Sequence, residues 1–220
     1  MSRPLIRRTD SYIYHLTNRS NNREWFYIPT DECWEIFCYA LNRTCIKYDV
    51  IPHLLVLMSN HFHLLLSTPQ SNIDTAMRYF QCETTRLVQK RTNRINHIFG
   101  ARYRWSLLES AYSLAYVYKY VARNPIRSGL CLKVEQYRYC SLNDLQNSLP
   151  IVEGLGSYWQ YVPKKTEDRM NWLNAPIPYE QESLIKRALR RYQFKFTTDK
   201  SFQKRLRELK SLYGIENTRP

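Results

Sequence analysis

This sequence lacks long hydrophobic runs and closely paired cysteines, and it has few acidic residues relative to basic ones. No apolar stretch approaches the roughly 20 residues that a membrane-spanning helix needs, and the basic first residues lead into no signal-peptide core. None of the six cysteines forms a Cys-x-x-Cys pair, which argues against a zinc knuckle. We therefore expect a cytoplasmic protein with no membrane partner, in which Cys38 and Cys45 are reduced thiols on the buried face of a helix.

The acidic residues are clearly outnumbered. The chain has 33 Lys and Arg against 19 Asp and Glu, which gives a formal net charge of +14. A folded chain this basic favours a polyanionic partner, and nucleic acid is the usual one. The 18 tyrosines and 5 tryptophans support that partner, because aromatic rings interleaved with arginine stack on unpaired bases. The alternative is a generally basic surface that has no partner.

The hydrophobic pattern predicts the order strand, helix, strand, strand, helix, strand. Apolar residues recur at helical spacing in the two helices and form short β-branched or aromatic runs in the strands. The strands are expected at 11–18, 50–58, 61–67 and 104–109, and the helices at 30–48 and from 72 onward. This order is typical of an α+β, ferredoxin-like fold, whose antiparallel sheet carries its helices on one face and leaves the other open to a substrate.

Two histidines lie two residues apart in the third expected strand. Because side chains alternate between the faces of a strand, His61 and His63 point the same way while Phe62 points into the core. Two imidazoles on one face of a rigid strand suit a divalent metal. They are equally consistent with histidines that only form hydrogen bonds at the sheet surface.

A helix that begins near residue 111 is expected to stop or kink near Pro125, and it carries Tyr120 and Asn124 one turn apart. An amide oxygen ligates hard cations, and a phenolic oxygen can act as a nucleophile. If this helix packs beside the histidine strand, the pair His61 and His63 together with Asn124 would hold Mg²⁺ or Mn²⁺ next to the phenol. Such a site suits DNA cleavage by transesterification, with the metal polarising the phosphate and the tyrosine forming a phosphotyrosine link.

The neighbouring aromatic and imidazole groups have competing explanations. Three more tyrosines crowd the same helix, and most of them are expected to pack in the core: Tyr112, Tyr116 and Tyr118. Only the spacing to Asn124 singles out Tyr120. His53 either shares the metal face or is a hydrogen-bonded sheet histidine, while His15 and His97 are expected to be structural or to face DNA.

The end of the chain differs in composition. A shift toward Gly, Pro and Ser at 150–156 predicts a boundary between a catalytic domain at 1–150 and a basic C-terminal DNA-binding extension at 151–220. Two short basic helices are expected there, at 185–192 and 201–213, with solvated helix faces as the alternative to DNA contact. The cations expected to contact DNA are Arg19, Arg102, Arg104, Lys119, Arg123, Arg187, Arg190, Arg191, Lys204 and Arg205.

Several segments resemble those of a known family. Met58-Ser-Asn-His-Phe-His-Leu-Leu-Leu66 resembles the histidine–hydrophobe–histidine motif of the HUH single-strand DNA endonucleases. Tyr120-Val-Ala-Arg-Asn-Pro-Ile-Arg-Ser-Gly129 resembles the tyrosine helix of single-tyrosine transposases. Tyr14-His-Leu-Thr-Asn-Arg19 and the segment 97–106 are similar to the first strand and to the lead into the last core strand. The opening Ser-Arg-Pro-Leu and the basic tail resemble REP-associated tyrosine transposases, which act at repetitive extragenic palindromes (REP) in bacterial chromosomes.

The resemblance covers most of residues 1–145 and carries specific implications. It implies a ferredoxin-like core, a divalent metal, and cleavage of single-stranded DNA near a hairpin beside which a short guide sequence is read. By position it makes His61, His63 and Asn124 the metal ligands and Tyr120 the nucleophile. The sequence departs from the family in three places: Ser59 replaces a common Pro, Ala122 replaces a frequent His, and Tyr139-Cys140-Ser141 replaces a Trp-Ser-Ser stretch.

These observations predict a metal-dependent endonuclease and strand transferase for single-stranded DNA at REP hairpins, working through a 5'-phosphotyrosine intermediate. Two other functions fit the same residues. One is a domesticated protein that binds DNA hairpins without cutting them, and the other is a metallonuclease in which water replaces Tyr120 as the nucleophile. We expect a nucleoid-associated monomer, because the basic tail can cover the surface that a partner subunit would use; a homodimer is the alternative.

Overall fold

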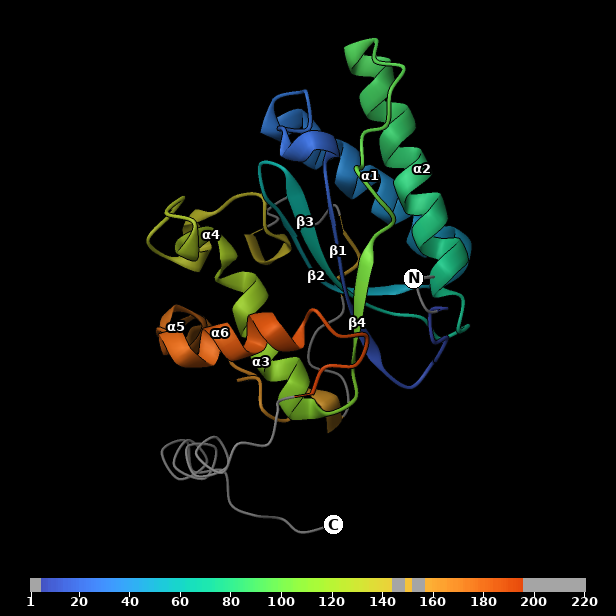
Figure 1. The fold of residues 1–220 in the computed structure, drawn as a ribbon. Helices are drawn as coiled ribbons and strands as arrows, with labels where there is room; N and C mark the ends of the chain where they lie inside the picture. The colour runs from blue at the N-terminus through green and yellow to red at the C-terminus, as the bar shows by residue number, and fades with distance from the viewer. Residues whose placement is uncertain (1–4, 144–148, 152–156, 196–220) are drawn as a thin grey trace.

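The computed structural model describes residues 5–143, 149–151 and 157–195. Its centre is a four-stranded antiparallel sheet in the order β2-β3-β1-β4 (Figure 1). The strands are β1 (Ile13–Arg19), β2 (Ile51–Leu57), β3 (His61–Ser67) and β4 (Arg104–Leu108). With the helices α1 (Thr30–Tyr48) and α2 (Ile73–Thr92) between them, they confirm the ferredoxin-like α+β fold.

Period-2 alternation sends the strand side chains into two separate cores. Phe62 and Leu64 of β3 lie in the first core, whereas Leu65 lies in the second. On β1, Tyr14 joins the first core and Ile13 the second. Every strand therefore has apolar side chains on both faces, and each face needs a covering layer.

The two long helices cover the first face. α1 and α2 lie side by side there (Figure 1), and Phe37 of α1 meets Phe80 of α2 and Phe62 of β3 with ring centroids 5.7 and 5.5 Å apart. Such edge-to-face contacts bury large rings in a favourable geometry. Asn72 occupies the N-cap position of α2, but its side chain makes no capping hydrogen bond to that helix. Its amide instead donates to the Tyr48 carbonyl, which connects the start of α2 to the end of α1.

The second face is covered as well, which differs from the open face expected. α3 (Ala111–Ala122) packs against it, followed by the short α4 (Asn124–Arg127) and by α5 (Thr166–Asn174) and α6 (Tyr179–Ala188) (Figure 1). The reason is the apolar content of this face, since burial of Val56 and Leu65 favours a second layer. The end of this face that carries the histidines borders a cleft.

The helices after residue 150 differ from those predicted. The expected helix at 185–192 is α6, which begins six residues earlier, after Pro178, and carries Glu180 and Glu182 in its first turn. Acidic side chains at a helix N-terminus are favourable, and a preceding proline marks the start. α5 was not predicted, and the expected helix at 201–213 lies outside the described residues.

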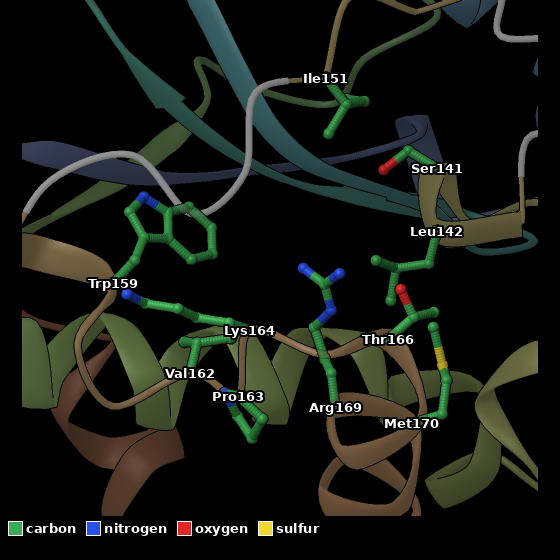
Figure 2. A pocket seen from close by; sticks show the side chains of 10 residues that line it. All are labelled: Ser141, Leu142, Ile151, Trp159, Val162, Pro163, Lys164, Thr166, Arg169 and Met170. Carbon is green, nitrogen blue, oxygen red and sulfur yellow. The ribbon is translucent and has the colours of Figure 1, made fainter.

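A cavity of about 590 Å³ lies between α5, the sheet and the segment around residue 141 (Figure 2). Ser141, Trp159 and Lys164 line it, and Arg169 extends into it from α5. Among the described residues that line this cavity, none belongs to the predicted catalytic or metal-binding set. The active site must therefore be sought elsewhere.

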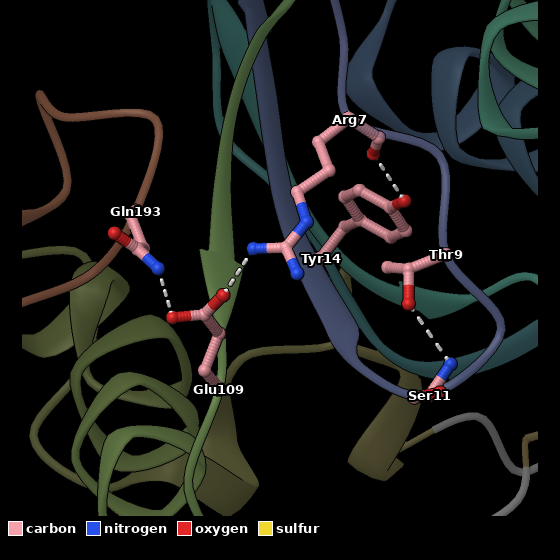
Figure 3. A network of polar contacts seen from close by, with 6 residues as sticks. All are labelled: Arg7, Thr9, Ser11, Tyr14, Glu109 and Gln193. Atoms are coloured by element: carbon pink, nitrogen blue, oxygen red, sulfur yellow. Dashed lines mark hydrogen bonds and ion pairs between the residues drawn. The ribbon is translucent and has the colours of Figure 1, made fainter.

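A polar network fastens both ends of the described chain to β4 (Figure 3). Arg7 forms an ion pair with Glu109, with Nη1 and Oε1 2.6 Å apart, and Gln193 donates to the other carboxylate oxygen. Backbone hydrogen bonds from Leu107 to Tyr192 and from Phe194 to Leu107 continue this attachment. The segment after α6 is thereby held along the outer edge of β4.

In the part of the chain that is described, no helix is both long and apolar enough to cross a lipid bilayer. Cys38 and Cys45 are buried on α1, as expected for core thiols.

Candidate active site

A cleft of about 450 Å³ opens where the histidine end of the sheet meets the α3–α4 junction. It contains all four residues of the predicted catalytic and metal-binding set. The lining residues are Thr17, Asn18, Arg19, Ser20, Arg23, His61, His63, Gly100, Ala101, Arg102, Arg104, Tyr120, Asn124, Arg127 and Lys186. The packing of the tyrosine helix beside the histidine strand is thus present in the fold.

The sheet register places the histidine pair. His61 lies opposite Arg19 of β1, and His63 lies opposite Thr17, which in turn lies opposite Arg104 of β4. Residues directly opposite on antiparallel strands share a face, so these side chains form one polar row across the sheet. The two imidazole rings are nearly perpendicular, with centroids 5.1 Å apart.

Both imidazoles are held in the neutral form. Burial, with the nearby Arg19 and Arg127 cations, lowers the pKa of His61 to about 4. Burial also lowers the pKa of His63 well below its ordinary value, and the neighbouring histidines and arginines act in the same direction. A neutral imidazole offers a lone pair to a metal, so the rings are ready to ligate at neutral pH.

Asn124 sits at the break between α3 and α4. Its side-chain NH₂ donates to the carbonyls of Tyr120 and Val121 at 2.9 and 3.4 Å. Pro125, which lacks a backbone N–H, is tolerated in the first turn of α4. Because the amide nitrogen is committed to the backbone, the amide oxygen is the Asn124 atom left for a ligand in the cleft.

The Tyr120 phenol has a cationic partner. Arg127 donates from Nη1 to Tyr120 Oη at 2.9 Å, and its guanidinium carbon lies 5.2 Å from the ring centre. Burial raises the pKa of Tyr120, Arg127 opposes this through its charge and hydrogen bond, and Glu182 adds a small rise. The phenol is therefore protonated at rest, with a cation placed to stabilise its anion.

A glycine ends the short helix α4. Gly129 adopts a left-handed conformation with φ of 70°, and its N–H bonds to the Ile126 carbonyl. Glycine adopts this conformation without the strain of a Cβ, so the four-residue helix ends at once.

The donor set fits a hard divalent cation. The described residues contain no cluster of three or more His, Cys, Asp or Glu side chains that could hold a metal. The cleft instead offers two imidazole nitrogens and one amide oxygen, from His61, His63 and Asn124. Three neutral ligands would leave positions open for water and phosphate oxygens, as a catalytic site requires.

The predicted DNA-contacting cations take several different positions in the structure. Arg19, Arg102 and Arg104 line the cleft. Arg190 lines an adjoining groove of about 250 Å³, which shares Arg102 and Arg104 with the cleft. Arg187 and Arg191 are exposed on the same segment, whereas Lys204 and Arg205 lie outside the described residues.

Lys119 and Arg123 do not line the cleft. Lys119 is buried, with its ammonium 5.2 Å from the centre of the Trp172 ring, and burial lowers its pKa to about 8. Arg123 donates from Nη1 to the carbonyls of Leu173 and Asn174 at 2.8 and 2.6 Å. Both side chains lie on the side of α3 that faces α5, so they fasten the two helices together.

Three cations of the cleft are absent from the predicted DNA-contacting set, and three histidines were left open. Arg23, Arg127 and Lys186 line the cleft; Arg127 is one turn beyond Asn124 in the quoted motif, but its contact with Tyr120 depends on how α4 continues from α3. His15 is buried in contact with His63 and does not line the cleft. His53 forms a hydrogen bond with Ser67 away from the cleft, and His97 is exposed.

Comparison with known proteins finds solved structures that are similar to this chain. The chain is similar to a solved structure of a REP-associated tyrosine transposase bound to a REP hairpin, at 14% identity and a TM-score of 0.57 over 72% of this chain and 93% of that one. A putative transposase from Deinococcus radiodurans R1 matches at 18% identity over 55% of this chain and 94% of that one, with a TM-score of 0.38. No curated protein sequence matches at the significance required of a relative.

The family assignment comes from the sequence itself. The model of IS200-like transposases matches residues 8–124, which is more than half of the chain and spans β1 through Asn124. The matched region includes the histidine pair, the tyrosine helix and both long helices. The chain therefore belongs to the family of IS200-like transposases.

Proposed function

We propose that the chain is a metal-dependent, sequence-specific endonuclease and strand transferase for single-stranded DNA, acting at REP hairpins through a 5'-phosphotyrosine intermediate. The observation that carries this proposal is the cleft that holds Tyr120 with Arg127 beside the neutral pair His61 and His63 and Asn124. A REP hairpin is the ligand named for the structurally similar transposase, which makes it the substrate to test first.

The proposed roles follow from the geometry. Arg19, Arg102 and Arg104 would hold the phosphates that flank the scissile bond, and Lys186 would extend this basic rim from α6. Mg²⁺ or Mn²⁺ held by the two histidines and the asparagine would polarise the scissile phosphate. Arg127 would stabilise the Tyr120 phenolate as its proton is lost.

The cleavage step conserves bond energy. Tyr120 Oη forms a bond to phosphorus while the bond from phosphorus to the 3'-oxygen breaks, and that oxygen takes up a proton. The products are a 5'-phosphotyrosine and a free 3'-hydroxyl. Because the new link is still a phosphodiester, a DNA 3'-hydroxyl can attack it and transfer the strand. Since one chain supplies every group named here, we propose that the monomer is active.

A denaturing gel tests the proposal. The protein is incubated with a single-stranded REP-hairpin oligonucleotide and Mn²⁺, and a covalent adduct is expected that Tyr120→Phe abolishes. Tyr116→Phe is the matched control, because Tyr116 lies on the same helix but does not line the cleft. Cleavage without an adduct would identify a hydrolytic metallonuclease, and binding without cleavage would identify a hairpin-binding protein; either result would overturn the proposal.

A further inference from the structure

The imidazole of His63 lines the cleft and also contacts a buried imidazole behind it, that of His15. His15 Nε2 lies 2.9 Å from His63 Nδ1, and the two rings stack at a centroid distance of 5.2 Å and an interplanar angle of 24°. His15 comes from β1, where it is the diagonal neighbour of His63 in the antiparallel register. It is 2% exposed, so water does not compete for this contact.

The contact links the two histidine tautomers. A neutral imidazole carries one N–H, and burial favours the neutral form of both rings. The hydrogen between them therefore belongs either to His63 Nδ1 or to His15 Nε2. In the first case His63 Nε2 keeps its lone pair for a metal; in the second case His63 Nε2 carries the hydrogen and cannot ligate.

His61 also has a hydrogen-bond partner behind it, Asn60, and this partner allows only one tautomer of His61. Asn60 Nδ2 donates to the Arg23 carbonyl at 2.8 Å, which directs Asn60 Oδ1 to His61. His61 Nδ1 lies 2.9 Å from that oxygen, and an amide oxygen can only accept. His61 Nδ1 must carry the hydrogen, and its Nε2 is left with the lone pair.

We infer that His15 is the positioning residue for His63: it accepts the hydrogen of His63 Nδ1 through its own Nε2 and so presents His63 Nε2 to the divalent metal. The inference rests on the metal site of the proposed function. Metal-ligating histidines commonly donate their other ring N–H to an outer partner, and loss of such a partner typically weakens metal affinity 10- to 100-fold. Here the outer partner is a third histidine rather than a carboxylate or a carbonyl.

Two variants of the full-length protein separate positioning from packing. His15→Phe keeps a ring stacked on His63 but has no acceptor, whereas His15→Gln keeps an amide oxygen close to the position of Nε2. We expect the Mn²⁺ dissociation constant, measured by electron paramagnetic resonance in the absence of DNA, to rise about 10- to 100-fold in His15→Phe. In His15→Gln it should stay within about threefold of the unaltered protein. In cleavage assays, excess Mn²⁺ should restore most of the rate of His15→Phe.

A second measurement needs no substitution. Long-range ¹H–¹⁵N correlation spectra of the Mg²⁺-loaded protein report which ring nitrogen carries the hydrogen, and we expect Nδ1–H for His63 and Nδ1–H for His15. A His63 Nε2–H tautomer in the loaded protein, or a folded His15→Phe that binds Mn²⁺ as tightly as the unaltered protein, would overturn the inference.

These readouts are independent of DNA cleavage. If His15→Phe weakens Mn²⁺ binding but no covalent adduct forms in the unaltered protein, the inference stands and the proposed function fails. If the adduct forms and His15→Phe binds Mn²⁺ normally, the function stands and the inference fails. Absence of Mn²⁺ binding by the unaltered protein would overturn both.

Discussion

Arg127 Nη1 donates a hydrogen bond to Tyr120 Oη at 2.9 Å across the break between α3 and α4. The same guanidinium lies over the tyrosine ring, and its charge also acts on His61 and His63. One exposed cation therefore opposes the effect of burial on the proposed nucleophile, and it adds to the effect of burial that keeps both imidazoles neutral. These two effects favour a phenolate beside imidazoles that are free to ligate.

Replacement of Arg127 should slow cleavage and shift its pH dependence. Arg127→Gln removes a charged hydrogen bond, which is worth about 1.5–3 kcal/mol and corresponds to a roughly 10- to 150-fold lower single-turnover rate. Because Arg127 lowers the pKa of Tyr120 against the effect of burial, its loss should move the rise of rate with pH to higher pH. Arg86→Gln, on α2 across the sheet, is the charge-matched control. An unchanged pH profile in Arg127→Gln would contradict this role.

Removal of one imidazole should separate chemistry from binding. His63→Ala is expected to lower cleavage at least 100-fold, since a bound metal contributes several kcal/mol of charge stabilisation in the transition state. Hairpin affinity in the presence of EDTA should stay within about threefold, because the phosphate-binding arginines supply most of the binding free energy. Gel shift and single-turnover cleavage measure the two quantities. Full cleavage by His63→Ala would rule out the assigned metal ligand.

The four residues of the proposed site could be picked out from the sequence because each depends on a short-range pattern. A spacing of two in a strand puts His61 and His63 on one face, and a spacing of four in a helix puts Tyr120 and Asn124 one turn apart. The order of strands and helices follows from hydrophobic periodicity in the same way. These patterns survive in the fold because they are fixed by local backbone geometry.

The remaining features depend on tertiary packing that local patterns do not encode. Lys119 and Arg123 flank Tyr120 in the sequence, yet they face α5, whose position beside α3 no periodicity predicts. The second face of the sheet was expected to be open because a ferredoxin-like sheet carries its two helices on one face, and no local pattern shows that α3 and α6 pack against the other. His15 was left undecided because its partner, His63, is 48 residues away.

The buried histidines should make the metal-free protein sensitive to acid. Burial lowers the pKa of His15 to about 3, whereas the pKa of histidine in an unfolded chain is about 6.5. Below pH 6.5 the unfolded state therefore binds a proton that the folded state does not, and stability falls as the pH falls toward 3. At pH 5 this one group should cost about 2 kcal/mol relative to pH 7.5.

Urea unfolding in EDTA at pH 7.5 and pH 5 measures this effect. His15→Gln, which has no titrating group at the position, should lose about 2 kcal/mol less than the unaltered protein between the two pH values. His97→Gln is the matched control, because His97 is exposed in the loop before β4. Equal losses in His15→Gln and the unaltered protein would show that the buried imidazole is not the acid-sensitive group.

The two classes of arginine should respond differently to salt. Arg104 lies on the cleft, and Arg104→Gln should flatten the slope of log affinity against log salt by about 0.7 for a single-stranded ligand, the effect of one lost phosphate contact. The Arg123 guanidinium instead donates hydrogen bonds to two backbone carbonyls. Arg123→Gln should therefore leave the slope unchanged and lower the free energy of unfolding by about 1.5–3 kcal/mol. Fluorescence anisotropy with a hairpin oligonucleotide measures the slope at salt concentrations of roughly 50 to 300 mM, where counterion release dominates the salt dependence. Urea unfolding measures the free energy of unfolding. A flattened slope in Arg123→Gln with normal stability would return that residue to the DNA-binding surface.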